Sequence, residues 1–128
     1  MIKYYLSLIG FILNSIVLAQ DYDYYFTGDT SDVSTSPDYG ICLMGGATED
    51  DNGAEWFLNK ADGGNIVVIR ASGSDGYNDY FFNQLGINVQ SVETIVFNSA
   101  NASSSAFIQR RIQGAEAIWI AGGDQFIY

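Results

Sequence analysis

The stretch Ile66-Val67-Val68-Ile69 decides the fold class of this chain of 128 residues. All four residues are apolar, so the segment is apolar on both faces, as expected of a parallel strand covered by helices on its two sides. Residues 92–97 and 117–121 are predicted to form further strands of the same kind. Helical patterns separate these strands along the chain. The alternation predicts an α/β fold, a parallel sheet with helices on both faces.

Another strand and a helix are predicted ahead of this stretch. Ile41-Cys42-Leu43-Met44 is a short, continuously apolar run that we expect to be the first strand. Asn52 is the expected N-cap of the next helix, and Glu55 completes a capping box. One face of that helix is formed by Ala54, Phe57, Leu58 and Ala61. A short helix is expected from about Asn78, and a third one buries Phe107, Ile108 and Ile112.

The loops that leave the expected strands differ from those that enter them. The leaving loops are long and rich in Gly, Ser, Asp and Asn, whereas the entering loops are short. Because parallel strands end at the same edge of a sheet, we expect all the long loops at one edge, where open α/β proteins bind ligands. The four loops are residues 45–50, 71–76, 98–105 and 122–125.

The first 38 residues are predicted to lie outside the domain. Residues 1–19 have one early positive charge, an apolar run and the ending Val17-Leu18-Ala19, which is typical of a secretory signal peptide cut before Gln20. We therefore expect a secreted or periplasmic protein that is free of the membrane after cleavage. Residues 20–38 are acidic and are expected to be a weakly ordered lead-in, with its first aromatic residues able to pack on the domain. Residues 39–128 form the predicted domain.

Composition excludes several kinds of function. The formal net charge is −10, and an acidic protein repels nucleic acid and anionic membranes. The chain has no histidine, so its own residues cannot supply an imidazole base. The single cysteine, Cys42, rules out an intramolecular disulfide and is expected to be a buried apolar residue rather than a nucleophile.

Short motifs point to neither a cofactor nor a metal. Gly45-Gly46 permits close approach of the backbone to a ligand, but no dinucleotide-binding or phosphate-loop pattern surrounds it. Glu49-Asp50-Asp51 offers oxygen ligands without the spacing of a calcium loop, and acids ahead of a helix also suit its dipole. Ser72-Gly73-Ser74 is not the nucleophile-elbow pattern of hydrolases. We expect no cofactor and no metal site.

The order and spacing of four stretches resemble the cyanophycinase family. These stretches are residues 41–50, 67–72, 91–94 and 118–125. The resemblance covers residues 39–128 and implies the N-terminal half of a serine peptidase with a flavodoxin-like, class-I glutamine-amidotransferase-like fold, truncated after the fourth strand. It implies hydrolysis of the β-aspartyl-arginine links of cyanophycin or a related arginine-bearing peptide. The intact enzyme is expected to be a homodimer.

The resemblance carries over few site residues. Gln125 matches the family glutamine that contacts substrate, and Gly123 and Asp124 match the turn that borders the oxyanion hole. Glu49 and Asp50 match the acidic pair that closes the first loop. The family's nucleophilic serine and its histidine have no counterpart here, so no catalytic residue is expected in this chain, which should be inactive alone. Two alternatives remain: a non-catalytic secreted substrate-binding module, or a fragment of a gene model.

Overall fold

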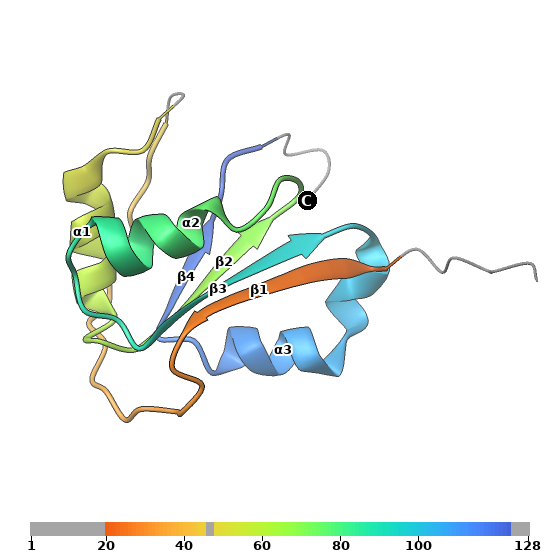
Figure 1. Ribbon diagram of the computed structural model, residues 1–128, viewed down its shortest axis with the longest axis horizontal. Coiled ribbons are helices and arrows are strands. Elements are labelled where there is room, and N and C mark those ends of the chain that lie inside the picture. Colours follow the sequence, from red (N-terminus) through yellow and green to blue (C-terminus); the bar gives the residue numbers. More distant parts are fainter. Residues whose placement is uncertain (1–19, 46–47, 124–128) are drawn as a thin grey trace, which may run out of the picture.

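The computed structural model describes residues 20–45 and 48–123, which form an α/β domain with one mixed four-stranded sheet (Figure 1). The strands are in the order β1-β3-β2-β4. Their bounds are β1 (Tyr22–Gly28), β2 (Asn65–Arg70), β3 (Ser91–Phe97) and β4 (Ala117–Ile120). The helical elements are α1 (Asp51–Lys60), α2 (Gly76–Asp79), a π-helical turn η1 (Tyr80–Gln84), a 3-10 turn η2 (Ala100–Ser104) and α3 (Ala106–Gln113).

Strand β2 lies inside the sheet, as its apolar sequence predicts. It pairs in parallel with β3 on one edge and with β4 on the other. Its first four residues are buried. The strands predicted at residues 66–69, 92–97 and 117–121 are therefore confirmed. None of the helices in the described residues is long and apolar enough to cross a membrane.

The prediction of a wholly parallel sheet is wrong at β1, whereas the first aromatic residues of segment 20–38 pack on the domain as expected. This strand pairs antiparallel with β3, with Tyr22 opposite Phe97 and Gly28 opposite Ser91. Tyr22 and Tyr24 pack on the ring of Phe107, the latter edge to face at 4.9 Å between ring centroids. Aromatic residues favour strands, and this contribution outweighs the acidic composition of the segment.

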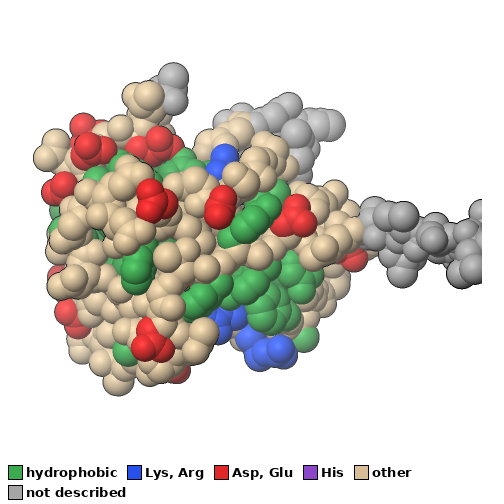
Figure 2. Space-filling view, in the orientation of Figure 1, with side chains coloured by type: hydrophobic (Ala, Val, Ile, Leu, Met, Phe, Trp, Pro, Cys, Tyr) green, Lys and Arg blue, Asp and Glu red, His purple; other side chains and the backbone are tan. Residues whose placement is uncertain are grey.

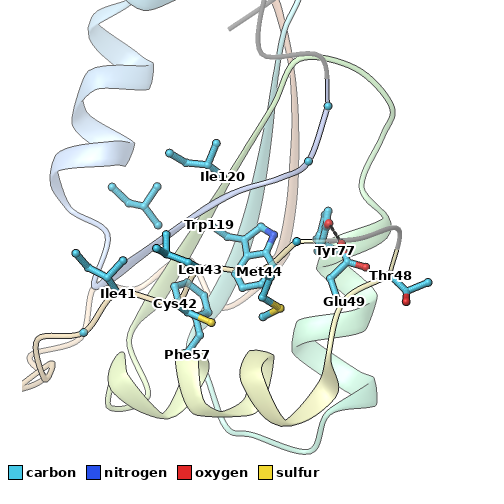
Figure 3. Close-up of a pocket in the computed structure, with 15 residues that line it drawn as sticks. Ile41, Cys42, Leu43, Met44, Thr48, Glu49, Phe57, Tyr77, Trp119 and Ile120 are labelled. Atoms are coloured by element: carbon cyan, nitrogen blue, oxygen red, sulfur yellow. Dashed lines mark hydrogen bonds between the residues drawn. The ribbon is translucent and has the colours of Figure 1, made fainter.

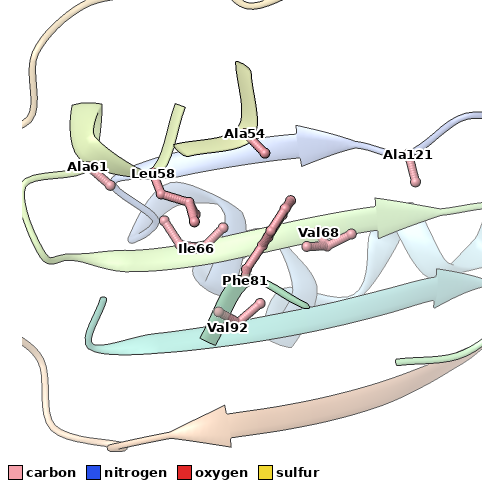
Figure 4. Packing of buried hydrophobic residues seen from close by; sticks show 8 residues of the cluster. All are labelled: Ala54, Leu58, Ala61, Ile66, Val68, Phe81, Val92 and Ala121. Atoms are coloured by element: carbon pink, nitrogen blue, oxygen red, sulfur yellow. The ribbon is translucent and has the colours of Figure 1, made fainter. Parts of the chain in front are cut away.

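Helices cover both faces of the sheet, as predicted (Figure 1). On one face, Ala54 and Leu58 of α1 and its C-cap residue Ala61 pack with Phe81 of η1 against β2 and β3 (Figure 4). On the other face, Ile108 of α3 and Ala102 of η2 pack against Val67 and Ile95. Burial of each large apolar side chain contributes about 1.5–3 kcal/mol, so these two layers provide the main stabilisation.

The strand expected at residues 41–44 is absent, and this prediction is wrong. Both edges of β2 are occupied by β3 and β4, and the segment does not pair with the open outer edge of β4. The segment instead follows α1. The backbone amide of Asp38 donates to the Lys60 carbonyl at 2.9 Å, Gly40 lies under the Trp56 ring, and the Cys42 thiol faces the Gly53 carbonyl at 3.9 Å. Ile41 and Leu43 stay 68% and 91% exposed.

The helix predictions hold, with a different cap for α1. Asp50, not Asn52, is its N-cap, and the Asp50 carboxylate accepts a hydrogen bond from the Gly53 amide at 2.8 Å. Aspartate is as good an N-cap as asparagine, and the helix begins one residue after it. Arg110 and Arg111 lie in the last turn of α3, where cations suit the helix dipole.

A buried carboxylate joins three elements on the α3 face. Glu93 of β3 is fully buried, with both oxygens engaged. Arg111 of α3 donates to Oε2 through Nε at 2.7 Å and to Oε1 through Nη2, and the Tyr24 hydroxyl of β1 donates to Oε2 at 2.9 Å. A buried charge is tolerated only when it is paired and hydrogen-bonded in this way. The cluster therefore fixes β1 and α3 on β3.

We expect Arg111→Met to lower the free energy of unfolding by about 3 kcal/mol, because it leaves the Glu93 carboxylate buried without its cation. Urea unfolding followed by circular dichroism measures the change. The control is Arg110→Met, which removes an exposed arginine from the adjacent position and should change the free energy by less than about 0.5 kcal/mol. Equal losses in the two variants would contradict the role given to Glu93.

Strand β4 forms an apolar edge of the sheet. Within the described residues no strand pairs with its outer side. Ile118 and Ile120 are 40% and 69% exposed, because they share the face of Val67 and Ile69 but lie beyond the reach of α3. An exposed apolar edge strand pairs readily with another edge.

We expect the purified chain to associate as its concentration rises, through pairing of β4 edges. Ile120→Lys should reduce this association, since a lysine at an edge strand opposes pairing. Sedimentation velocity at increasing concentration measures the effect. Asn88→Lys adds the same charge at an exposed loop position and should leave association unchanged. A wild-type chain that stays monomeric at all concentrations would refute the prediction.

Candidate functional site

Three of the predicted loops meet at one edge of the sheet. Because β2, β3 and β4 are parallel, the segments that follow Arg70, Phe97 and Ile120 all leave the same edge. This confirms the expected arrangement for the loops after these strands. The first loop, residues 45–50, does not follow a strand. Of the turn after β4, Gly122 and Gly123 are described, whereas Asp124 and Gln125 lie outside the described residues.

A pocket of about 680 Å³ lies between β4, α1 and the segment of residues 40–45 (Figure 3). Its aromatic side chains are Phe57 of α1, Tyr77 of α2 and Trp119 of β4. The pocket thus brings together two groups of expected site residues from distant parts of the chain, since Glu49 and Gly123 both line it. Asp50 does not line the pocket. Its carboxylate caps α1 instead.

The acidic residues around Asp50 are tied to tyrosines of the next helix. The Tyr77 hydroxyl donates to Glu49 Oε1, and the Tyr80 hydroxyl donates to Asp51 Oδ1 at 2.7 Å. Burial and, after it, the hydrogen bond to Glu49 raise the pKa of Tyr77 above its ordinary value. Burial and the hydrogen bond to Asp51 raise the pKa of Tyr80 in the same way. These contacts position Glu49 at the rim of the pocket.

A metal is not favoured at this acidic stretch. Among residues 20–45 and 48–123, no group of three or more acidic, histidine or cysteine side chains is arranged to hold a metal ion. Each of the three neighbouring carboxylates has another partner, namely the Gly53 amide for Asp50 and a tyrosine hydroxyl for Glu49 and for Asp51. Their first role is therefore to begin α1 and to attach α2 to it.

Ser72, Ser74 and Cys42, the candidate nucleophiles, have no adjacent histidine base. Ser72 and Ser74 are exposed in the loop after β2. Cys42 is half-buried and lines the pocket, with its thiol directed at a backbone carbonyl. A nucleophile needs an adjacent base, and no histidine exists in the sequence. The described residues that line the pocket therefore contain no nucleophile paired with a histidine base.

Sequence reasoning missed three residues of this edge. Tyr77 and Trp119 were passed over because single aromatic residues in predicted helices and strands usually belong to the core, and their rings do pack on Phe81. Arg70 was passed over as the end of a strand. The signal for it was present, because Arg70 is the only charged residue in the strand and stands at its carboxyl end.

No family model, no curated protein and no solved structure matches this sequence.

We expect stability to fall as pH rises past the ordinary tyrosine pKa near 10. Tyr77 and Tyr80 have raised pKa values in the folded protein, so the unfolded chain loses these protons first, and the stability that they contribute is present below pH 10 and is lost above it. Urea unfolding at about pH 8 and about pH 11 measures this loss.

The double variant Tyr77→Phe, Tyr80→Phe should show a smaller loss between the two pH values, because it has no phenols to titrate at these positions. The control is Tyr39→Phe, which changes a tyrosine that is 87% exposed and should keep the wild-type loss. An unaltered pH dependence in the double variant would argue against these two tyrosines as the cause.

Proposed function

We propose that this chain is the N-terminal part of a secreted, cyanophycinase-like serine peptidase with a class-I glutamine-amidotransferase-like domain. The observation that carries the proposal is the position of the Gly122-Gly123 turn. It follows β4 directly, at the carboxyl edge of three parallel strands, and it lines a pocket together with Glu49. Ligand sites of open α/β sheets lie at this edge.

In this proposal the chain supplies binding and the oxyanion border. Backbone N–H groups of a glycine-rich turn at a strand end are suited to stabilise the negative charge that develops on a carbonyl oxygen. Gln125 would contact the substrate, as the family resemblance implies. The nucleophilic serine and its base are absent from these 128 residues, so the chemical step needs residues that this chain does not contain.

The substrate class in the proposal is a β-aspartyl peptide bearing arginine. The acidic composition of the chain supports it, since a net charge of −10 attracts a cationic polymer. On the face shown in Figure 2, acidic side chains are widely spread and basic ones occupy only a few places. Glu49 at the pocket rim keeps its second carboxylate oxygen, Oε2, for a basic side chain, because Tyr77 engages Oε1.

A second candidate function is a secreted substrate-binding module without chemistry. The specific observation in its favour is that the pocket is formed by this chain alone, with three aromatic side chains and one carboxylate at its rim. Such a module would bind the same class of peptide and release it unchanged. The reading frame after Tyr128 separates the two proposals, because only the peptidase requires a downstream serine elbow and a histidine.

We expect the purified chain to release no product from a β-aspartyl-arginine dipeptide, because it lacks both a base and an elbow serine. If the reading frame continues into an elbow serine and a histidine, Gln125→Ala in that longer protein should lower kcat by about 10²–10³, the cost of losing one polar contact to the transition state. Asp50→Ala is the control. It removes a helix cap, so it should cost about 1 kcal/mol of stability and leave kcat nearly unchanged.

Two results would contradict the proposal. The first is turnover by the 128-residue chain that persists through repurification. The second is an equal loss of kcat in the two variants of the longer protein, compared at equal folded fraction. Binding of the dipeptide by the chain, together with a reading frame that has no downstream elbow, would favour the binding module.

A further inference from the structure

Arg70 differs from the other basic residues of the described domain. Lys60 pairs with Asp38 at 3.4 Å, Arg111 pairs with the buried Glu93, and Arg110 is exposed on α3. Arg70 is half-buried at the carboxyl end of β2, and no carboxylate of the described residues lies within ion-pair distance of it. Within residues 20–45 and 48–123, this acidic protein thus holds a partly buried guanidinium without a counter-charge.

The Arg70 guanidinium is held in place on two sides. Nη1 donates to the Ser74 carbonyl at 2.8 Å, and the guanidinium carbon lies 5.3 Å from the centroid of the Tyr77 ring. Nε is buried and has no hydrogen-bond partner in the described part of the chain. A buried charged donor without an acceptor is rare in folded proteins and indicates a missing partner. The side of the guanidinium formed by Nε and Nη2 is therefore the side that needs one.

Gly73 lies against this side. A Cβ atom at Gly73 would stand 2.5 Å from Nη2 and 2.9 Å from the guanidinium carbon, and the φ angle of Gly73 is +92°. Only a residue without a side chain fits there. Ser72 and Ser74, on either side of it, have exposed side chains that can add hydroxyl donors. The loop therefore covers this side of the guanidinium with a glycine turn, which provides no side-chain acceptor for Nε.

We propose that Arg70 is the binding residue of a site for the carboxylate group of a small molecule or peptide. For the carboxylate to bind at the Nε–Nη2 side, where a guanidinium binds both carboxylate oxygens at once, the Gly73 turn has to move away from it. The location agrees with ligand binding at the carboxyl edge of the strands. A carboxylate fits better than a phosphate, because Asp75 lies in the same loop and the chain has a net charge of −10. The site does not depend on the proposed peptidase.

The test is a nuclear magnetic resonance titration of the purified chain, observing the Arg70 Nε–H signal. The probe is sodium acetate, with acetamide as the neutral control of equal shape and sodium chloride at equal ionic strength. We expect the Arg70 signal to move along a saturating curve with acetate and to stay in place with the two controls. The Arg110 signal, from an exposed side chain, should not saturate.

Two variants sharpen the test. Arg70→Lys keeps the charge but loses the paired donors, so it should weaken acetate binding about tenfold or more, followed at the backbone amides of the loop. Arg110→Gln removes a positive charge at an exposed position of α3 and should bind acetate as the wild type does. If Arg70→Lys does not fold, the wild-type titration still decides, because Nε is observed directly.

Three outcomes overturn the proposal. The Arg70 signal does not saturate with acetate, it moves equally with acetamide, or Arg110→Gln weakens binding as much as Arg70→Lys does. Saturable binding of inorganic phosphate tighter than that of acetate overturns the assignment of a carboxylate. A peptidase assay has no part in this test, so failure of the proposed function and failure of this site are distinguished.

Discussion

Strand β2 has a paired neighbour on each edge and a helical layer on each face, and the other elements take their positions from it. Its residues alternate between the two cores, with Ile66 and Val68 toward α1 and Val67 toward α3. Helices are therefore required on both sides of the sheet. Its parallel pairing with β3 and β4 brings three strand ends to one edge, which is where the candidate site forms.

The second constraint is the charge buried at Glu93. A carboxylate in the middle of an apolar strand is costly unless its oxygens are paired, and here a helix and the antiparallel strand supply the partners. Strand β1 thus completes the sheet in two ways, through its backbone ladder with β3 and through the Tyr24 hydroxyl. The acidic start of the described chain becomes an edge of the sheet because its tyrosines bury ring area and satisfy this charge.

The sequence was sufficient where one local signal dominated. The apolar run at residues 66–69 and the helical spacing around Leu58 and Ile108 predicted β2, α1 and α3, because burial alone decides such segments. The sequence was insufficient where it must decide which segments pair with which strands of the sheet. Residues 41–44 have the composition of a strand, yet they lie along α1 and pair with no described strand, an outcome that depends on contacts between distant parts of the chain. The same holds for β1, whose partner β3 is more than sixty residues away.

The candidate site, too, was predictable where local patterns decide the structure and unpredictable where contacts between distant residues do. The edge of the sheet that carries it follows from strand direction, so Gly123 and the loop after β2 were expected there. The meeting of Glu49 with Tyr77, and of Arg70 with Gly73, required side-chain geometry that no spacing rule contains. Asp50 is acidic like its neighbours Glu49 and Asp51, but it has a different role, since only its backbone position lets it cap α1.

The unpaired outer edge of β4 also forms one wall of the pocket. Ile118, Trp119 and Ile120 line the pocket, so a strand that paired with β4 would take up the space in front of them. Pairing at this edge and occupation of the pocket by a ligand therefore compete for the same surface. Arg70 and Gly73 are outside that competition, since they belong to β2 and its following loop, on the inner side of β4. The Tyr77 ring that lies against Arg70 also packs on Trp119 of β4, at 6.0 Å between ring centroids, so a change at β4 reaches the proposed carboxylate site through this ring.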